Sequence, residues 1–412
     1  MALASLSSEL KQYLIVTGNY WAFTLTDGAL RMLVVLHFHS LGYSPLDIAL
    51  LFLFYELFGV VTNLVGGWLG AHIGLNRTMN IGLGLQILAL GMLLVPTTLL
   101  SVGWVMAAQA VSGIAKDLNK MSAKSAVKTL VPANAEGKLY QWVAVLTGSK
   151  NALKGAGFFL GGALLSLFGF QGAVGLMAAM LTIVWISSLF FLHADIGQAK
   201  NKPKFTQLFS KSAPINVLSA ARMCLFGARD VWFVVALPVF LASQLGWNHW
   251  YVGGFLACWV IGYGIVQGFA PSITGKASGK VPDGRVAMIW AGMLTVIPAL
   301  IALALANGIA PIFSVVIGLL VFGGIFAVNS SLHSYLIVSY AREDGVSLDV
   351  GFYYMANAMG RLLGTLLSGW IYQEHGLVAC LWASSILLAI ACTVSYWLPT
   401  GSQNVSSSSS RL

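Results

Sequence analysis

The sequence predicts an all-α integral membrane protein with twelve transmembrane helices in two six-helix bundles. Only 8% of its 412 residues are charged, 58% are hydrophobic, and the mean hydropathy is +0.82. A soluble domain carries roughly 25% charged residues, so this chain has too few polar side chains to cover a water-soluble globule. A soluble enzyme is therefore excluded.

Apolar runs of span length divide the chain into the predicted helices. A bilayer core about 30 Å thick requires about 20 apolar residues per helix. Twelve runs fit this requirement, at residues 13–36, 48–71, 79–96, 103–125, 139–167, 173–192, 215–241, 250–271, 286–306, 311–338, 350–372 and 377–398. The first run has full span length and no small-residue cleavage site follows it, so we expect it to stay as a span and not to be removed as a signal peptide.

Lysine and arginine predict the orientation in the inner membrane. If the N-terminus is cytoplasmic, none of the six outward connections contains a Lys or Arg. The cations of the opposite side are Lys11, Arg77, Lys124, Lys128, Lys138, Lys200, Lys202, Lys204, Lys211, Lys276, Lys280, Arg285, Arg342 and Arg411. The positive-inside rule therefore places both termini in the cytoplasm, and we assign these cations to topology, not to substrate binding.

The longest connection between spans separates the chain into two halves. The predicted domains are residues 1–192 and 214–400, with a lysine-containing cytoplasmic loop at 193–213 and a disordered serine-rich tail at 401–412. A weak internal echo aligns Leu33-Val-Val-Leu with Phe233-Val-Val-Ala, and Leu41-Gly-Tyr with Leu245-Gly-Trp. Six spans, a basic loop and six further spans fit the parallel half-repeats of the major facilitator architecture.

A signature of that architecture is degenerate in this chain. The stretch from Gly67 to Arg77 keeps the glycines of the helix end and one basic residue, but Ala71 stands where an acidic residue is usual. The gating latch that this motif builds is therefore in doubt.

Charged residues remain at membrane depth after the loop cations are set aside. A charge at the bilayer centre costs at least about 2.5–3.5 kcal/mol, so these side chains must line a wet cavity or pair with one another. The cations are Arg31, Lys116, Lys120, Lys150, Lys154, Arg222, Arg229 and Arg361, and the acids are Asp27, Glu56, Asp117 and Asp230.

Helical spacing places many of these charges on shared faces. The sets on one face are Asp27 with Arg31, Lys116 with Lys120, Lys150 with Lys154, Arg222 with Arg229, and Asn357 with Arg361. We predict that the eight cations and Asn357 bind substrate, and that Asp27, Glu56, Asp117 and Asp230 are candidates for proton coupling. The four lysines of this set would bind one end of the substrate, and its four arginines would bind the other end.

Buried ion pairs are the alternative explanation. They would join Asp27 to Arg31, Asp117 to Lys120, and Asp230 to Arg229 or Arg222. Even if each acid pairs once, four cations are left over, which favours a dianionic or trianionic substrate. Arg and Lys together favour phosphate-like groups over simple carboxylates.

Other residues have structural interpretations. We expect Cys224, Cys258, Cys380 and Cys392 to be core thiols, and His37 and His39 to lie at the membrane interface. His333, four residues after Asn329, is a candidate for the cavity. The pairs Gly66 and Gly70, Gly157 and Gly161, and Gly360 and Gly364 have the GxxxG spacing of close helix packing. We expect no metal and no cofactor.

Specific segments carry a family resemblance. They begin at Gly18-Asn-Tyr-Trp-Ala, Ser112-Gly-Ile-Ala-Lys, Leu146-Thr-Gly-Ser-Lys and Phe226-Gly-Ala-Arg-Asp. Along nearly its full length the chain resembles the ArsJ-type organoarsenical efflux permeases of the major facilitator superfamily. That resemblance implies export of 1-arseno-3-phosphoglycerate, which forms when a glyceraldehyde-3-phosphate dehydrogenase uses arsenate in place of phosphate, and hence arsenate resistance.

The residues agree with such a polyanion, because the first half contains no cysteine that could bind trivalent arsenite. Two further classes stay open. One is a transporter of other organophosphates or organic anions. The other is an integral membrane enzyme, which the absence of HExxH, HxxxxD and GxSxG motifs disfavours. The expected partners are the small anion and the lipid bilayer, with no nucleic acid, and the chain is expected to be a monomer.

Overall fold

The structure is a computed structural model that describes residues 8–42, 51–131, 136–192, 198, 211–247, 249–274 and 282–400. The predicted tail, almost all of the predicted central loop, and Lys200, Lys202, Lys204, Lys276, Lys280 and Arg411 lie outside these residues. The side chain of His39 also lies outside the description.

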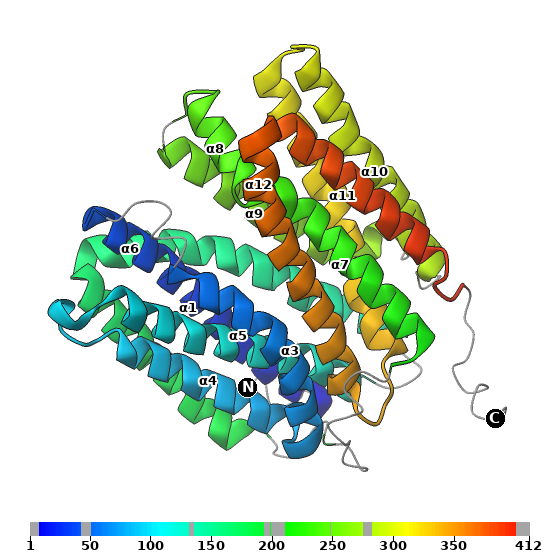
Figure 1. The fold of residues 1–412 in the computed structure, drawn as a ribbon. Coiled ribbons are helices and arrows are strands. Elements are labelled where there is room, and N and C mark those ends of the chain that lie inside the picture. The colour runs from blue at the N-terminus through cyan, green and yellow to red at the C-terminus, as the bar shows by residue number, and fades with distance from the viewer. Residues whose placement is uncertain are drawn as a thin grey trace. The chain divides into compact units, whose positions relative to one another are not determined.

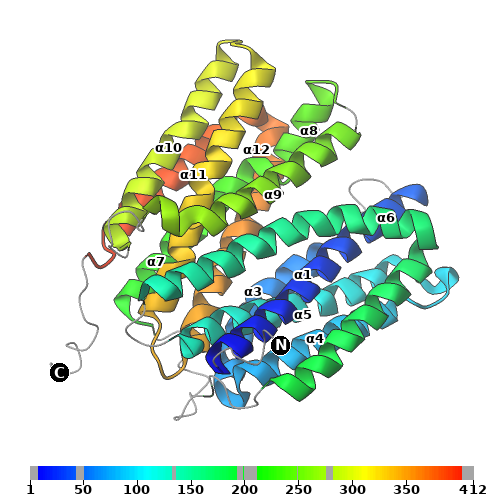
Figure 2. The same cartoon turned by 180° about the vertical axis from the view of Figure 1, so that it is seen from behind.

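Every described element is helical, and the helices follow the predicted spans closely (Figures 1 and 2). In chain order they are α1 (Ser8–Ser40), α3 (Leu53–Ile73), α4 (Leu75–Met92), a 3₁₀ turn (Thr97–Leu99), α5 (Val102–Leu130), α6 (Glu136–Phe191), α7 (Ala213–Phe233), α8 (Ala236–Ser243), α9 (His249–Thr274), α10 (Gly284–Ala306), α11 (Pro311–Tyr340) and α12 (Val346–Ser395).

Two long helices each contain two predicted spans. Gly169 in α6 has φ 67° and Gly376 in α12 has φ 72°, so each helix is interrupted at a glycine that adopts the left-handed conformation without a Cβ clash. The opposite case is the predicted span 215–241, which is divided into α7 and α8. Ser368 accepts a hydrogen bond from the Ala236 amide at this break (3.1 Å), which satisfies a backbone donor at the broken helix. With α7 and α8 taken as one span, the helices supply the twelve predicted spans.

Seven helical segments of the described chain are long and apolar enough to cross a membrane by composition alone. They are Leu53–Ile73, Gly137–Phe191, Ala213–Leu241, Tyr251–Thr274, Gly284–Ala306, Pro311–Tyr340 and Val346–Ser395. Helices α1 and α5 are outside this set, and they carry Asp27, Arg31, Lys116, Asp117 and Lys120. Intramembrane charge lowers the hydropathy of the helices that bear it.

The chain forms two compact units. Unit 1 contains Met1–Ala135, Leu146–Phe209 and Glu343–Met355, and unit 2 contains Glu136–Val145, Ser210–Arg342 and Ala356–Leu412. In unit 1, α5 contacts α1, α3 and α4, and in unit 2, α11 contacts α7, α9 and α10. Helix α5 therefore packs against three helices of unit 1, and α11 packs against three helices of unit 2.

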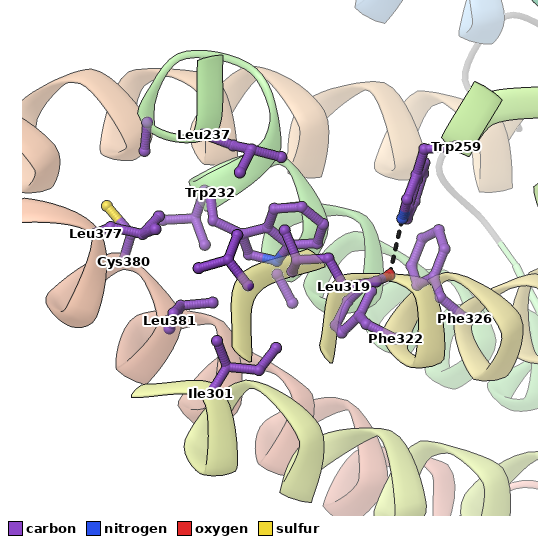
Figure 3. Close-up of a cluster of buried hydrophobic side chains, with 14 of the residues drawn as sticks. Trp232, Leu237, Trp259, Ile301, Leu319, Phe322, Phe326, Leu377, Cys380 and Leu381 are labelled. Atoms are coloured by element: carbon purple, nitrogen blue, oxygen red, sulfur yellow. Dashed lines mark hydrogen bonds between the residues drawn. The ribbon is translucent and has the colours of Figure 1, made fainter. Parts of the chain in front are cut away.

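A cluster of buried aromatic and aliphatic side chains holds α7 in unit 2 (Figure 3). Trp232 of α7 is fully buried, and its ring meets Phe322 of α11 edge-on with centroids 5.0 Å apart. Trp259 of α9 donates a hydrogen bond to the carbonyl of Leu319 (2.8 Å). These contacts fix the part of α7 that carries Arg229 and Asp230.

Two of the three predicted GxxxG pairs meet a neighbouring backbone, whereas Gly66 and Gly70 lie against side chains. A Cβ at Gly161 would collide with the backbone of Ala29 on α1, and one at Gly360 would collide with the backbone of Met223 on α7. In unit 1, Gly67 lies against Gly351 of α12, and Ser347 donates a hydrogen bond to the Gly67 carbonyl (2.7 Å). Ala71 packs against Leu348, so this contact is apolar where the signature motif would place a charge.

The prediction that all four cysteines are core thiols is wrong for one of them. Cys380 is buried and belongs to the cluster of Figure 3, and Cys224 and Cys392 are half-buried, whereas Cys258 is exposed. The apolar face of a membrane helix accepts a thiol as readily as a protein core does.

Candidate transport site

Asp117 organises the charges of α5. Its carboxylate lies 2.5 Å from Lys120 Nζ and 3.7 Å from Lys116 Nζ, and its side chain is 2% exposed. The predicted pair with Lys120 is therefore confirmed, and Lys116 joins it. Gly59 of α3 makes room for the carboxylate, because a Cβ there would lie 2.8 Å from Asp117 Oδ2.

Tyr55 of α3 connects α1 with α5. Its hydroxyl donates a hydrogen bond to Asp27 Oδ1 (2.6 Å), and Lys116 Nζ lies 3.7 Å from the centre of its ring. A buried ammonium above an aromatic face gains a favourable cation–π interaction. One tyrosine thus links a predicted coupling acid to a predicted substrate ligand.

Arg31 pairs with Glu56 instead of Asp27, which makes the predicted Asp27–Arg31 pair wrong. Arg31 Nη2 lies 3.3 Å from Glu56 Oε1, and its guanidinium lies over the rings of Phe52 and Tyr55. Both charged side chains are about a quarter exposed, at 26% and 28%. The carboxylate of Asp27 instead accepts the hydrogen bond from Tyr55.

Lys124 belongs to this site and not to the loops. It is 3% exposed, its ammonium donates to Thr147 Oγ1 of α6 (2.8 Å), and it lies 5.1 Å from the ring centre of Tyr354. Lys120 lies 4.8 Å from the same ring. Counting Lys124 among the loop cations is thus wrong, because its side chain is buried and the residue lies inside α5, which continues to Leu130. The four-residue spacing from Lys116 through Lys120 pointed to Lys124.

Lys150 and Lys154 are half-buried on α6. A Cβ on Gly28 would lie 2.7 Å from the carbonyl oxygen of Lys154, so α6 meets α1 one residue beyond Asp27. Close backbone contact therefore brings the second lysine pair to the helix that carries Asp27 and Arg31.

Asp230 is the centre of the charged cluster in unit 2. Its carboxylate is fully buried and receives Arg229 Nε at 2.6 Å on one oxygen and Arg361 Nε at 3.2 Å on the other. The predicted pair with Arg229 is confirmed, and Arg361 is a second partner. The Asp230 side chain also lies against Gly364, so the glycine pair on α12 permits the approach of Arg361.

Arg222 lies deeper in the same unit and is 3% exposed. Its Nε donates to Asn357 Oδ1 (2.9 Å), its Nη1 donates to the carbonyl of Ser330 (3.2 Å), and its Cζ lies 3.9 Å from the ring centre of Phe226. Asn357, predicted to contact substrate, thus holds a predicted substrate-binding arginine. The ring of Phe226 also contacts Arg229, whose Cζ lies 4.9 Å from the ring centre.

Both units carry an excess of positive charge among the described residues at membrane depth. Unit 1 combines Arg31 and five lysines with Asp27, Glu56 and Asp117, and cations still outnumber acids if the buried Asp349 of α12 is added. Unit 2 combines three arginines with Asp230. Local ion pairs reduce this excess but do not cancel it in either unit.

Besides Lys124, two aromatic residues of the site were missed by sequence reasoning. Tyr55 and Tyr354 supply the rings that the lysines of α5 lie against. Aromatic residues are common throughout the chain, and their spacing does not distinguish a ring in the site from one facing lipid. The signal that distinguishes them is tertiary.

Solved transporters share this fold. The human organic anion transporter MFSD10 (TETRAN) superposes with a TM-score of 0.74 at 16% identity, over 95% of this chain and 100% of that one. The Escherichia coli fucose:proton symporter FucP superposes with a TM-score of 0.71 at 12% identity, over 93% and 98%. A bacterial homologue of the iron transporter ferroportin gives 0.72 at 15% identity, over 95% and 99%.

The sequence itself assigns the family. No curated protein sequence matches the chain significantly. The family profile of the Major Facilitator Superfamily matches residues 14–281 and 258–411, which together cover almost all of the chain and both halves of it. This match agrees with the predicted architecture of six plus six spans. It also agrees with the prediction that the chain is a membrane transporter and not an enzyme. The chain belongs to the Major Facilitator Superfamily.

Proposed function

We propose that this transporter exports a small organic polyanion with phosphate-like groups, and that its substrate is 1-arseno-3-phosphoglycerate. The observation that carries the proposal is the excess of cations over acids at membrane depth in each unit taken by itself. A cation excess at membrane depth is costly unless an anion compensates it. Each cluster is proposed to bind one phosphate-like group.

The side-chain types favour oxyanions. Guanidinium groups bind phosphate-like groups through two parallel hydrogen bonds, and ammonium groups add point charge without fixing geometry. Unit 2 supplies arginines and unit 1 mainly lysines. Trivalent arsenic prefers thiolates, and the four cysteines all lie in the second half of the sequence, whereas the site lysines all lie in the first half.

The arsenical substrate is supported by the family resemblance of the segments around Asp27, Lys116, Lys150 and Arg229. A glyceraldehyde-3-phosphate dehydrogenase that accepts arsenate would supply the substrate inside the cell. Export followed by breakdown of the labile arsenate ester would confer arsenate resistance. The functional link to that dehydrogenase is part of the proposal.

The transport cycle is proposed to be alternating access by a monomer in the inner membrane, with both termini cytoplasmic and with two six-helix domains at 1–192 and 214–400. Candidates for proton coupling are Asp27, Glu56, Asp117 and Asp230. Three of them are engaged by cations, and Asp27 by Tyr55. Asp27 is the most direct candidate, because its protonation would change the hydrogen bond to Tyr55 and so the ring beneath Lys116.

A second candidate function is transport of ordinary organophosphates or other organic anions. An arsenate ester and a phosphate ester carry the same charges on similar tetrahedral groups, so the cation clusters suit both. The fold similarity to an organic anion transporter is compatible with this alternative.

The test uses inside-out membrane vesicles that contain the protein. Glyceraldehyde 3-phosphate, arsenate, NAD and the dehydrogenase generate the arsenical outside the vesicles, and arsenic inside them is measured by mass spectrometry. We expect arsenic to accumulate only when the dehydrogenase and the transporter are both present, with weak competition by 3-phosphoglycerate. Accumulation without the dehydrogenase would contradict the arsenical proposal, and strong uptake of 3-phosphoglycerate with no uptake of arsenic would select the alternative.

A further inference from the structure

Helices α7 and α11 of unit 2 run antiparallel in a register that three contacts define. The ring of Trp232 meets Phe322, and the ring of Phe226 meets Phe326 with centroids 5.2 Å apart. Arg222 then donates to the carbonyl of Ser330. Each step toward the start of α7 is matched by a similar step toward the end of α11. The next turn therefore places Ser219 level with His333.

This turn and the one at Arg222 contain polar side-chain atoms that have no hydrogen-bond partner within the described chain. The atoms are Ser219 Oγ, Asn329 Oδ1, His333 Nδ1 and Ser334 Oγ, and each of the four residues is at most 2% exposed. The neighbouring Ser331 differs, because its hydroxyl donates to the carbonyl of Gln267 (3.3 Å). Packing against α9 thus accounts for Ser331 but leaves the other four atoms without a role in the fold.

Polar atoms buried without a partner destabilise a protein, and native structures pair the great majority of them. An apolar side chain of similar size would serve the helix packing better. The four groups are a hydroxyl pair, an amide oxygen and an imidazole nitrogen, so they offer neutral donors and acceptors. They suit the hydroxyl groups of a ligand and not its charged groups, whereas Arg222 lies one turn from Ser219 and suits an oxyanion.

We propose that Ser219, Asn329, His333 and Ser334 form a hydroxyl-recognition subsite for the carbon skeleton of the transported anion. The inference rests on the proposed function, because Arg222 binds the charged group beside the subsite. The four polar atoms are sealed from solvent in this structure, so a ligand reaches them when α7 and α11 separate locally. The subsite selects hydroxylated anions over deoxy anions of equal charge.

The test compares two anions that differ in one hydroxyl group. 3-Phosphoglycerate and its 2-deoxy analogue, 3-phosphooxypropionate, are titrated against the purified full-length protein by calorimetry. We expect the wild type to bind the hydroxylated anion roughly three- to tenfold more tightly, which is the range of one or two ordinary hydrogen bonds. Ser219→Ala and Ser334→Ala should each reduce this affinity ratio toward one, mainly by weakening the binding of the hydroxylated anion.

Ser331→Ala is the matched control, because it removes a buried hydroxyl from the same helix that already has a protein partner. It should keep the wild-type ratio and lower the melting temperature, whereas Ser334→Ala should leave the melting temperature unchanged or raise it. A structural role for all three serines would instead lower the melting temperature in each variant and leave every ratio unchanged.

The outcomes separate the subsite from the proposed function. Equal binding of both anions by the wild type, or a ratio that Ser219→Ala and Ser334→Ala leave unchanged, would overturn the subsite while anion binding itself stands. Failure of both anions to bind the wild type would also overturn the subsite, whereas the proposed function is overturned only if arsenic fails to accumulate in the vesicles.

Discussion

The charged cluster of each unit holds a buried carboxylate between two cations, but the two clusters use different cationic side chains. In unit 1, Asp117 is held by two lysines whose stems are flexible and whose ammonium groups lie on tyrosine rings. In unit 2, Asp230 is held by two arginines, one of them packed on Phe226. Lysine can move its charge to follow a ligand, whereas a guanidinium packed on a ring and bound to a carboxylate is fixed in direction.

The comparison predicts that one cluster contributes more to stability and the other more to transport. The arginine cluster depends on its acid for stability, because two guanidinium groups converge on one buried carboxylate. The lysine cluster tolerates change more readily, because long stems can bring the ammonium groups to water. Substitutions in unit 2 should therefore cost more stability, and substitutions in unit 1 should act more on transport.

The largest effect is expected for Asp230→Asn. Removing one partner of a buried ion pair costs about 3–5 kcal/mol, because the remaining charges are left uncompensated. We expect the melting temperature of this variant in detergent, measured by fluorescence of the purified protein, to be much lower than that of the wild type. Asp117→Asn is the matched variant in unit 1, and its melting temperature should decrease less. Equal losses in the two variants would remove the distinction between the clusters.

Tyr55→Phe should have the next largest effect. It removes the hydrogen bond to Asp27 and keeps the ring beneath Lys116, so the cation–π contact is preserved. Hydrogen bonds to carboxylates contribute about 1.5–3 kcal/mol. We expect slower transport in vesicles with near-normal substrate affinity. A variant that transports at the wild-type rate would exclude Tyr55 from the coupling of Asp27.

Thr147→Val probes the buried position of Lys124. The substitution keeps the shape of the side chain and removes the hydroxyl that accepts from the ammonium group. We expect a stability loss of about 1 kcal/mol, because the ammonium also lies near Tyr354 and keeps that contact. Thermal unfolding measures the loss. No loss at all would indicate that Lys124 behaves as a solvated loop cation, as its sequence position had indicated.

Glu56→Gln should have the smallest effect. The pair with Arg31 is about a quarter exposed on both sides, and pairs of that kind contribute about 0.2–1 kcal/mol. The expected change is a small shift in melting temperature that decreases with added salt. A loss as large as that of Asp230→Asn would show that Glu56 is an essential buried acid.

Most of the fold could be predicted from the sequence, because the length and spacing of apolar runs reflect the thickness of the bilayer. Observed helices begin and end within a few residues of the predicted runs, and Gly169 and Gly376 each lie in a short predicted connection between two runs. The break between α7 and α8 was not predicted. It depends on a hydrogen bond from Ala236 to Ser368, far away in the sequence.

The charged residues of the site could be identified from the sequence, but their partners could not. Spacing along one helix suggested that Arg31 pairs with Asp27, yet Glu56 on a neighbouring helix takes the guanidinium and Tyr55 takes the carboxylate. Lys124 was counted with the loop cations although it falls at the end of the predicted run 103–125, because its burial against Thr147 depends on a neighbouring helix. Both errors have the same cause: pairing depends on which helices are adjacent, and composition carries no information about adjacency.

The central claim is that cations at membrane depth bind the substrate, and one measurement tests it most directly. Arsenic accumulation in inside-out vesicles is compared for the wild type, Lys150→Gln, Arg229→Gln and the exposed control Arg285→Gln, at equal amounts of inserted protein. Our account predicts that Lys150→Gln and Arg229→Gln abolish accumulation and that Arg285→Gln retains it. Accumulation at the wild-type rate in both Lys150→Gln and Arg229→Gln would contradict the account.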